Sequence, residues 1–417
     1  MTNLVRVADL SMPHRLGQAA VRLTGTDGRP LAHTDVVVRQ TRHAFLFGNI
    51  AFDLAEGAHP TAPPQASSSG PDWLDLFNLA TLPFYWRRFE PEPGHPHTAH
   101  LREAAELLRQ RGVRIKGHPL TWHTLAPLWL RGVEPDEVAA TLRARITRDV
   151  GQFAGSVTIW DAVNEPTILP HFTAEPNAIT ELAHRIGRLG VLRLAFDTAR
   201  TADPAATLVL NDFDLSPAFE RVIEDALDAG LPLDAIGLQT HMHQGFRGED
   251  ALSDIVQRFA HFGLPIHMTE TSLVSGHLMP PEIVDLNDYQ VASWPSTPEG
   301  EARQADEIVR HYRCLLAEPS VQAITYWGLC DAGAWLGAPI GLLRADGTRK
   351  PAYDALHALI KGEWWIGPTS VRTDDDGRFD LHGFLGDYRV ECAHKHTDFS
   401  LAQTDAIAVT LAAGCSH

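Results

Sequence analysis

The segment Trp160-Asp161-Ala162-Val163-Asn164-Glu165-Pro166 has the pattern of a buried β-strand that ends in polar residues. Pro166 would stop the strand, because proline has no backbone N–H to donate to a sheet. Proline also restricts the residue before it, so we expect extended backbone at Glu165 and a carboxylate at the mouth of the strand. Taken alone, the segment fits a solvated glutamate on a loop equally well.

Short apolar runs alternate with helical patterns on both sides of this segment, which is typical of repeated βα units. Strands are expected at 45–50, 79–84, 114–117, 156–163, 207–211, 235–239, 265–269 and 323–327. Eight parallel strands close a barrel. A doubly wound open sheet would instead need a phosphate-binding glycine loop after its first strand, and Gly48-Asn49-Ile50 provides none. We therefore predict the α/β class and a (β/α)8 TIM barrel.

Short β-strand patterns flank the predicted barrel at both termini. They occur at 21–23 and 35–39, and again at 371–373, at 378–381 and from Gly386 onward. We divide the chain into an N-terminal β segment at 1–44, the catalytic barrel at 45–362 and a C-terminal β segment at 363–417. The two segments can pack together as one small module, for which the sequence indicates no ligand.

Composition excludes several classes of partner. The net charge is −17, so the surface would repel a nucleic-acid backbone, whereas a neutral sugar meets no such barrier. Apolar runs such as 323–329 are too short to span a membrane, so no membrane partner is expected. The first 20 residues contain no apolar core of a signal peptide. The sequence therefore leaves two possibilities for the compartment: a cytoplasmic protein, or a secreted protein in its mature form.

A second carboxylate ends the apolar run Pro265-Ile266-His267-Met268-Thr269-Glu270. Glu165 and Glu270 would follow the fourth and seventh strands and face each other across the barrel mouth, where such barrels place their active sites. Two facing carboxylates are what a retaining glycosidase needs, one as proton donor and one as nucleophile. The charge of the nucleophile would keep the pKa of the proton donor high. This chemistry requires no cofactor and no metal.

Over residues 45–362 the chain resembles the family 10 glycoside hydrolases, chiefly endo-1,4-β-xylanases. The resemblance rests on the combination of Gly117-His118-x-Leu120-x-Trp122-His123, Trp160-Asp161-x-Val163-Asn164-Glu165, Gly237-Leu238-Gln239-x-His241, Thr269-Glu270, Trp327-Gly328-x-x-Asp331 with Trp335 beyond, and Lys350-Pro351-Ala352-Tyr353.

The resemblance implies roles for the residues of these motifs. Glu165 is similar to the acid/base and Glu270 to the nucleophile of the family. Substrate-binding roles are implied for Asn164, His118, Trp122, Gln239, His241, Trp327 and Trp335. Asn164 would bind the sugar 2-hydroxyl, His241 would orient the nucleophile, and the indoles would pack on sugar faces. Singly, Trp122 and Trp327 also fit barrel core, and His118 fits a structural histidine.

The chain departs from the family in two places. Glu270-Thr271-Ser272 has a serine where the family usually has an aspartate that supports the histidine beside the nucleophile. His241 would then be held less firmly, and its pKa would be raised less. On the second strand, the Glu-Asn-x-x-Lys-Trp segment of the family is replaced by Thr81-Leu82-Pro83-Phe84-Tyr85-Trp86. Three polar sugar contacts would be lost, which predicts a remodelled distal glycone subsite.

The expected function is a retaining endo-1,4-β-xylanase that cleaves xylan or xylo-oligosaccharides. Three alternatives stay open: a retaining β-glycosidase for another glycan, a non-catalytic carbohydrate-binding protein, and a metal-dependent hydrolase that uses His241-Met242-His243. Trp294, in a proline-rich insertion after the seventh strand, either shapes the aglycone side or packs the loop.

Overall fold

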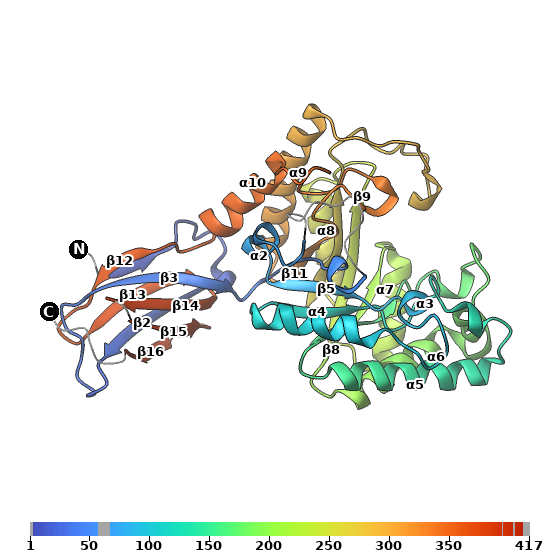
Figure 1. Cartoon of the computed structure of the whole chain (residues 1–417), viewed down its shortest axis with the longest axis horizontal. Coiled ribbons are helices and arrows are strands. Elements are labelled where there is room, and N and C mark those ends of the chain that lie inside the picture. The colour runs from blue at the N-terminus through green and yellow to red at the C-terminus, as the bar shows by residue number, and fades with distance from the viewer. Residues whose placement is uncertain (1–2, 57–66, 394, 403–404, 412–417) are drawn as a thin grey trace. The chain divides into compact units, whose positions relative to one another are not determined.

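A computed structural model describes residues 3–56, 67–393, 395–402 and 405–411. Contacts divide the chain into two compact units, one of residues 1–46 and 353–417 and one of residues 47–352. Figure 1 shows parallel strands surrounded by helices in the second unit. No helix in the described ranges is both long and apolar enough to cross a lipid bilayer.

The second unit is built on a closed barrel of eight parallel strands, in the order β10-β11-β4-β5-β6-β7-β8-β9. The strands are β4 (Leu46–Ile50), β5 (Leu79–Pro83), β6 (Arg114–His118), β7 (Ile159–Asn164), β8 (Thr207–Asp212), β9 (Ala235–Met242), β10 (Ile266–Leu273) and β11 (Val321–Tyr326). All eight expected strands are present and the predicted barrel is confirmed. Strands β9 and β10 run three and four residues beyond their expected ends at 239 and 269.

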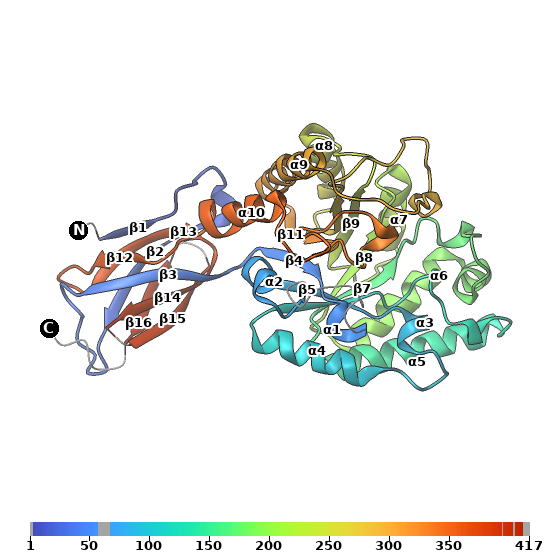
Figure 2. The same ribbon diagram turned by 45° about the horizontal axis from the view of Figure 1, so that its top comes forward.

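Helices connect successive strands and cover the outside of the barrel (Figures 1 and 2). They are α1 (Asp53–Glu56), α2 (Pro71–Leu76), α3 (Trp86–Phe89), α4 (Thr98–Gln110), α5 (Pro135–Phe153), α6 (Ala178–Ala202), α7 (Pro217–Asp228), α8 (Glu249–Ala260) and α9 (Pro298–Ala317). Because helices cover one face and side chains fill the interior, β7 and β10 are buried at every residue. This double burial explains why the strands read as apolar runs.

Two irregularities lie on the strands that carry the predicted catalytic carboxylates. In β7 the pairing with β8 shifts register between Asp161 and Val163, and in β10 the pairing with β9 shifts between Met268 and Glu270. Such a bulge inserts one residue and breaks the alternation of side chains between the two faces. As a result, Asp161 and Asn164, three residues apart, both make contacts inside the barrel, and so do the adjacent residues Thr269 and Glu270.

The first unit consists of two four-stranded sheets, β1-β13-β2-β16 and β12-β3-β14-β15. The strands are β1 (Leu4–Arg6), β2 (Leu16–Thr24), β3 (Asp35–His43), β12 (Thr369–Arg372), β13 (Arg378–Phe384), β14 (Gly386–Cys392), β15 (Lys395–Leu401) and β16 (Asp405–Thr410). Strands from both ends of the chain pair in each sheet, for example β2 with β13 and β3 with β14, as Figure 2 shows in blue and red. The helix α10 (Pro351–His357) and a π-helical turn at Ala358–Glu363 precede the C-terminal strands.

Candidate active site

Glu165 follows the C-terminal end of β7, and its carboxylate is contacted by side chains from the loop after β6, from the end of β7 and from β9. The Trp122 indole Nε1–H donates to Oε2 at 2.8 Å. The amides of Asn164 and Gln239 donate to Oε1 at 3.3 and 3.5 Å. His123 Nε2 lies 3.5 Å from Oε2. Only 14% of the Glu165 side chain is exposed, so the solvated-loop interpretation does not hold.

The backbone of Glu165 differs from the prediction of an extended conformation, which was wrong. Its φ is +56°, in the left-handed region. The Glu165 N–H donates to the Asn211 carbonyl at 2.7 Å, which extends the β7–β8 ladder past the end of β7. A non-glycine residue in this region costs about 1–3 kcal/mol, and such strain is found where surrounding contacts fix a residue for function. These contacts overrule the preference that Pro166 imposes.

Glu270 lies within β10 and is almost completely buried. Its Oε1 accepts a hydrogen bond from Asn211 Nδ2 at 2.9 Å, and its Oε2 lies 3.2 Å from His241 Nε2. His118 Nε2 approaches Oε1 to 4.0 Å. The carboxylate is therefore fixed at both oxygens.

Side-chain amides connect the two glutamates. Asn211 Nδ2 donates to Asn164 Oδ1 at 2.7 Å as well as to Glu270. Gln239 Nε2 lies 3.2 Å from the same Asn164 oxygen. Because Asn164 also donates to Glu165, a short chain of amides runs from one carboxylate to the other. The two glutamates belong to one polar cluster.

His118 belongs to a buried cluster of charged side chains that fixes its ring. His118 Nδ1 lies 2.6 Å from Asp161 Oδ2, and Lys116 Nζ lies 2.8 Å from the same oxygen. All three side chains are at most 1% exposed. Burial opposes ionisation of Asp161, but Lys116 and His118 outweigh it and lower the pKa of Asp161. A charged Asp161 fixes the His118 ring so that Nε2 faces Glu270.

Aromatic rings from the loop after β11 border the cluster. The Trp327 ring centroid lies 5.3 Å from that of His118 and 6.1 Å from that of His241. The Trp335 ring is 4.9 Å from His241. The structure thus brings together all nine residues predicted for the site. Trp294 is instead buried, and its indole donates to the His277 carbonyl at 2.7 Å, so it packs the insertion.

Several residues of the cluster were not assigned a role from the sequence, namely Asn211, Asp161, Lys116 and Asp212. Asn211 and Asp212 end strand β8, and a polar pair at a strand end was the signal that identified Asn164 and Glu165. Asp212 is buried and accepts from the Thr167 and Asp214 N–H groups at 2.8 and 2.9 Å. Burial raises the pKa of Asp212 to about 6.

The changed second strand leaves a different surface beside His118. Thr81 and Leu82 are completely buried in β5, and no hydrogen bond to the Thr81 hydroxyl is found within the described residues. Tyr85 is half-buried, and its ring lies 5.5 Å from His118 and 5.7 Å from Trp122. The Tyr85 ring therefore occupies the region where the family resemblance predicted that polar sugar contacts are lost.

His241 and His243, the two histidines of the metal-dependent alternative, contact different groups. His241 contacts Glu270 through Nε2 and Ser272 through Nδ1. His243 is buried between the rings of Trp335 and Trp294. Over the part of the chain that the structure describes, no three His, Cys, Asp or Glu side chains are grouped to hold a metal ion.

Comparison with known proteins decides the family. Residues 84–359, well over half of the chain, match the sequence profile of glycosyl hydrolase family 10. This chain belongs to glycosyl hydrolase family 10. The predicted family is confirmed, and the chain is a glycoside hydrolase.

Relatives of this family 10 chain are distant. It is 28% identical over 266 residues to the beta-1,4-xylanase of Dictyoglomus thermophilum, a match that covers 60% of this chain and 70% of the relative. It is 26% identical over 333 residues to endo-1,4-beta-xylanase B of Thermotoga neapolitana, covering 75% and 89%. The solved structure of GH10 from Paenibacillus barcinonensis is similar in fold, with a TM-score of 0.63, 23% identity, and coverage of 76% and 94%.

The two glutamates of this family 10 chain are held in opposite protonation states. Burial, with smaller contributions from the charges of Asp212 and Glu270, raises the pKa of Glu165 to about 8. Burial also acts on Glu270, but the His241 hydrogen bond and the charges of His118, His241 and Lys116 outweigh it and lower the pKa of Glu270. Near neutral pH, Glu165 is therefore protonated while Glu270 is ionised.

These pKa shifts predict the pH dependence of kcat/KM. Activity needs protonated Glu165 and ionised Glu270, so kcat/KM should fall above about pH 8 and also at acid pH, below the ordinary range of a glutamate. The Trp122 hydrogen bond favours the charged form of Glu165. Trp122→Phe should therefore move the alkaline limb to higher pH and leave the acid limb in place. An alkaline limb that does not move in this variant would contradict the assignment.

Ser272 provides a second prediction. It is completely buried, and its Oγ lies 3.0 Å from His241 Nδ1. Ser272→Ala should lower kcat/KM about tenfold, because a buried ring nitrogen loses its partner. Ser253→Ala, on α8, is the control, and equal effects of Ser253→Ala and Ser272→Ala would refute the role of Ser272.

Proposed function

We propose that this chain is a retaining endo-1,4-β-xylanase that acts by double displacement, with Glu270 as nucleophile and Glu165 as acid/base. The observation that carries the proposal is the pair of glutamates in one polar cluster, held in opposite protonation states. A retaining mechanism requires one neutral and one charged carboxyl group at the start of the reaction. Further support comes from the named xylanases to which the chain is similar.

In the first step, a Glu270 oxygen forms a bond to the anomeric carbon. The glycosidic C–O bond breaks, and the leaving oxygen takes the proton of Glu165. Asn211 and His241 hold the two Glu270 oxygens, which restricts the carboxylate to one orientation for attack. The product of this step is a covalent glycosyl-enzyme ester.

In the second step, Glu165 takes a proton from water as the water oxygen attacks the anomeric carbon. The ester bond to Glu270 breaks, so the product retains the β configuration. The charge of Glu270 is one of the causes that raise the pKa of Glu165, and this charge is lost in the ester. Glu165 therefore becomes more acidic at the stage where it must act as a base.

The residues around the glutamates would bind the sugar. We assign Asn164, His118 and Gln239 to hydrogen bonds with hydroxyl groups, and Trp122, Trp327 and Trp335 to packing against the sugar ring. The net charge of −17 supports a neutral glycan rather than a nucleic acid as the partner.

Hydrolysis of an aryl β-xylobioside by the wild-type chain tests the proposed substrate, with the cellobioside and the arabinoside as comparisons. Preferred cleavage of the xylobioside would support a xylanase. Cleavage of another glycoside in place of the xylobioside would show that the changed second strand has altered the substrate. Binding of xylo-oligosaccharides without any turnover would favour a carbohydrate-binding protein.

Tyr85 is the residue through which we expect the distal glycone subsite to be remodelled, because its ring adjoins His118 and Trp122. Tyr85→Ala should lower kcat/KM for an aryl β-xylobioside about tenfold, as expected for the loss of one aromatic contact surface. The effect on an aryl β-xyloside, which lacks the second sugar, should be smaller. Tyr85→Phe keeps the ring and should resemble wild type. Equal effects of Tyr85→Ala on both substrates would refute the distal role.

A further inference from the structure

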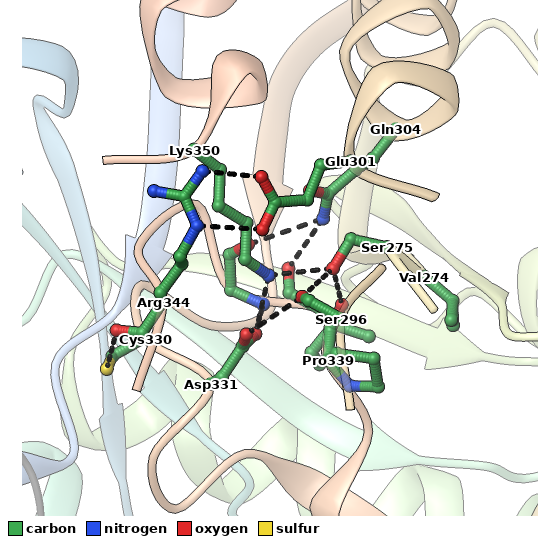
Figure 3. Close-up of polar contacts among 12 residues, drawn as sticks. Val274, Ser275, Ser296, Glu301, Gln304, Cys330, Asp331, Pro339, Arg344 and Lys350 are labelled. Atoms are coloured by element: carbon green, nitrogen blue, oxygen red, sulfur yellow. Dashed lines mark hydrogen bonds and ion pairs between the residues drawn. The ribbon is translucent and has the colours of Figure 1, made fainter. Parts of the chain in front are cut away.

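Lys350 is a completely buried lysine outside the catalytic cluster. Figure 3 shows its ammonium group pointing toward Asp331 and Ser275. The Nζ atom lies 2.7 Å from Asp331 Oδ1 and 2.8 Å from Ser275 Oγ. A buried charge persists only where partners compensate it, and Asp331 and Ser275 are the partners that compensate the Lys350 ammonium group.

Asp331 organises the loop of residues 331–341 that follows β11. Its Oδ1 accepts the Gly341 N–H at 2.9 Å, so this carboxylate closes the loop on itself. Its Oδ2 accepts from the Ser296 hydroxyl at 3.3 Å, which reaches the segment before α9. One carboxylate therefore ties both ends of the loop to a neighbouring segment.

Ser275 connects the same loop to β10, the strand of Glu270. It lies two residues beyond the end of β10 at Leu273. Its hydroxyl donates to the Pro339 carbonyl at 2.7 Å, and its backbone N–H donates to the same carbonyl at 2.9 Å. Lys350 therefore bridges the loop and the end of the strand that carries the nucleophile.

The loop presents Trp335 to the active site. The Trp335 ring lies 4.9 Å from the ring of His241, whose Nε2 contacts Glu270. The His243 ring also adjoins Trp335, at 5.2 Å between centroids, and is a buried ring for which the described residues show no hydrogen bond to either nitrogen. The adjacent Leu336 has a φ of +61°, an uncommon conformation for a residue with a side chain. The tip of the loop is thus held by ring packing, while the polar anchors lie at its base.

We propose that Lys350, with Asp331 and Ser275, is a positioning residue that fixes the 331–341 loop so that Trp335 lies against His241 beside the nucleophile. Lys350 touches neither glutamate and acts through the loop. The kinetic consequence of this arrangement rests on the proposed xylanase function, whereas the position of Trp335 does not. Without the lysine, the loop keeps the Ser275–Pro339 hydrogen bonds but loses its charged anchor at Asp331, and Trp335 should sample other positions.

The test labels the whole 417-residue chain with 5-fluorotryptophan and follows the Trp335 resonance by ¹⁹F NMR, assigned by its loss in Trp335→Phe. Lys350→Met should shift or broaden this resonance. It should also raise KM for an aryl β-xylobioside about tenfold while kcat changes less than about threefold, because uniform binding rather than chemistry is weakened. Glu301→Gln is the matched control, since Glu301 pairs with Arg344 of the adjacent segment at 2.8 Å (Figure 3). It should leave the resonance and KM unchanged.

Two further variants guard against misfolding of Lys350→Met, in which Asp331 loses its buried counter-charge. The double variant Lys350→Met with Asp331→Asn removes both charges, and Ser275→Ala removes the hydroxyl between Lys350 and the Pro339 carbonyl while both charges stay. Both should change the Trp335 resonance, the double variant more than Ser275→Ala. An unchanged Trp335 resonance in the folded variants would overturn the proposal. If wild type does not cleave the xylobioside, the proposed substrate fails, but the resonance still decides whether Lys350 positions Trp335.

Discussion

Glu270→Ala is expected to lower kcat for an aryl β-xylobioside by at least about 10⁴-fold, because no other group can take the place of the nucleophile. Glu270 is buried and held by Asn211 and His241, so its removal leaves a small space next to the anomeric carbon. The same substitution at Glu103, an exposed residue on α4, should leave kcat unchanged.

Added azide distinguishes loss of the nucleophile from general damage to the fold. In Glu270→Ala, azide can enter the vacated space and attack the anomeric carbon from the face that Glu270 used. A single displacement then gives the α-glycosyl azide. A β-glycosyl azide, or residual activity within about tenfold of wild type, would show that Glu270 is not the nucleophile.

Glu165→Ala is expected to separate the two steps of the reaction. With a dinitrophenyl β-xylobioside the leaving group needs no proton, so the first step should proceed, while the second step loses its base. A burst of dinitrophenolate close to the enzyme concentration should precede slow turnover, and KM should fall. With xylan, whose leaving group needs the proton, activity should fall by about 10²–10⁴-fold.

Added azide should give a product of opposite configuration in Glu165→Ala and in Glu270→Ala. Glu270 is intact in this variant and forms the ester, so azide should attack the ester from the opposite face and give the β-glycosyl azide. The alkaline limb of kcat/KM that reports the Glu165 pKa of about 8 should disappear. Persistence of that limb, or an equal loss on both substrates, would assign the acid/base role to another group.

The sequence was sufficient to predict the barrel because its strands are buried along their length. Runs such as 159–164 and 266–273 are buried at every residue, so they stand out from the amphipathic helices between them. The site residues could be found for a related reason. In a parallel barrel all strands end at one face, so polar residues at strand ends converge.

The details that the sequence did not predict depend on contacts between distant residues. The bulges in β7 and β10 redirect Asp161 and Glu270, and no turn residue marks either of them. At Glu165, the bond to the Asn211 carbonyl overrules the local preference set by Pro166. The sequence indicated that the two flanking segments can pack together, but not which of their strands pair, because the pairs join residues hundreds of positions apart, such as Val21 and Phe379.

Trapping of the covalent intermediate tests the central claim most directly. An aryl 2-deoxy-2-fluoro-β-xylobioside should inactivate the wild-type chain, because fluorine slows both steps whereas a good leaving group speeds only the first. Mass spectrometry should then show one added fluoroxylobiosyl group per chain, attached to a peptide through Glu270. Turnover of xylobiosides without any adduct, or an adduct on a residue other than Glu270, would contradict the account.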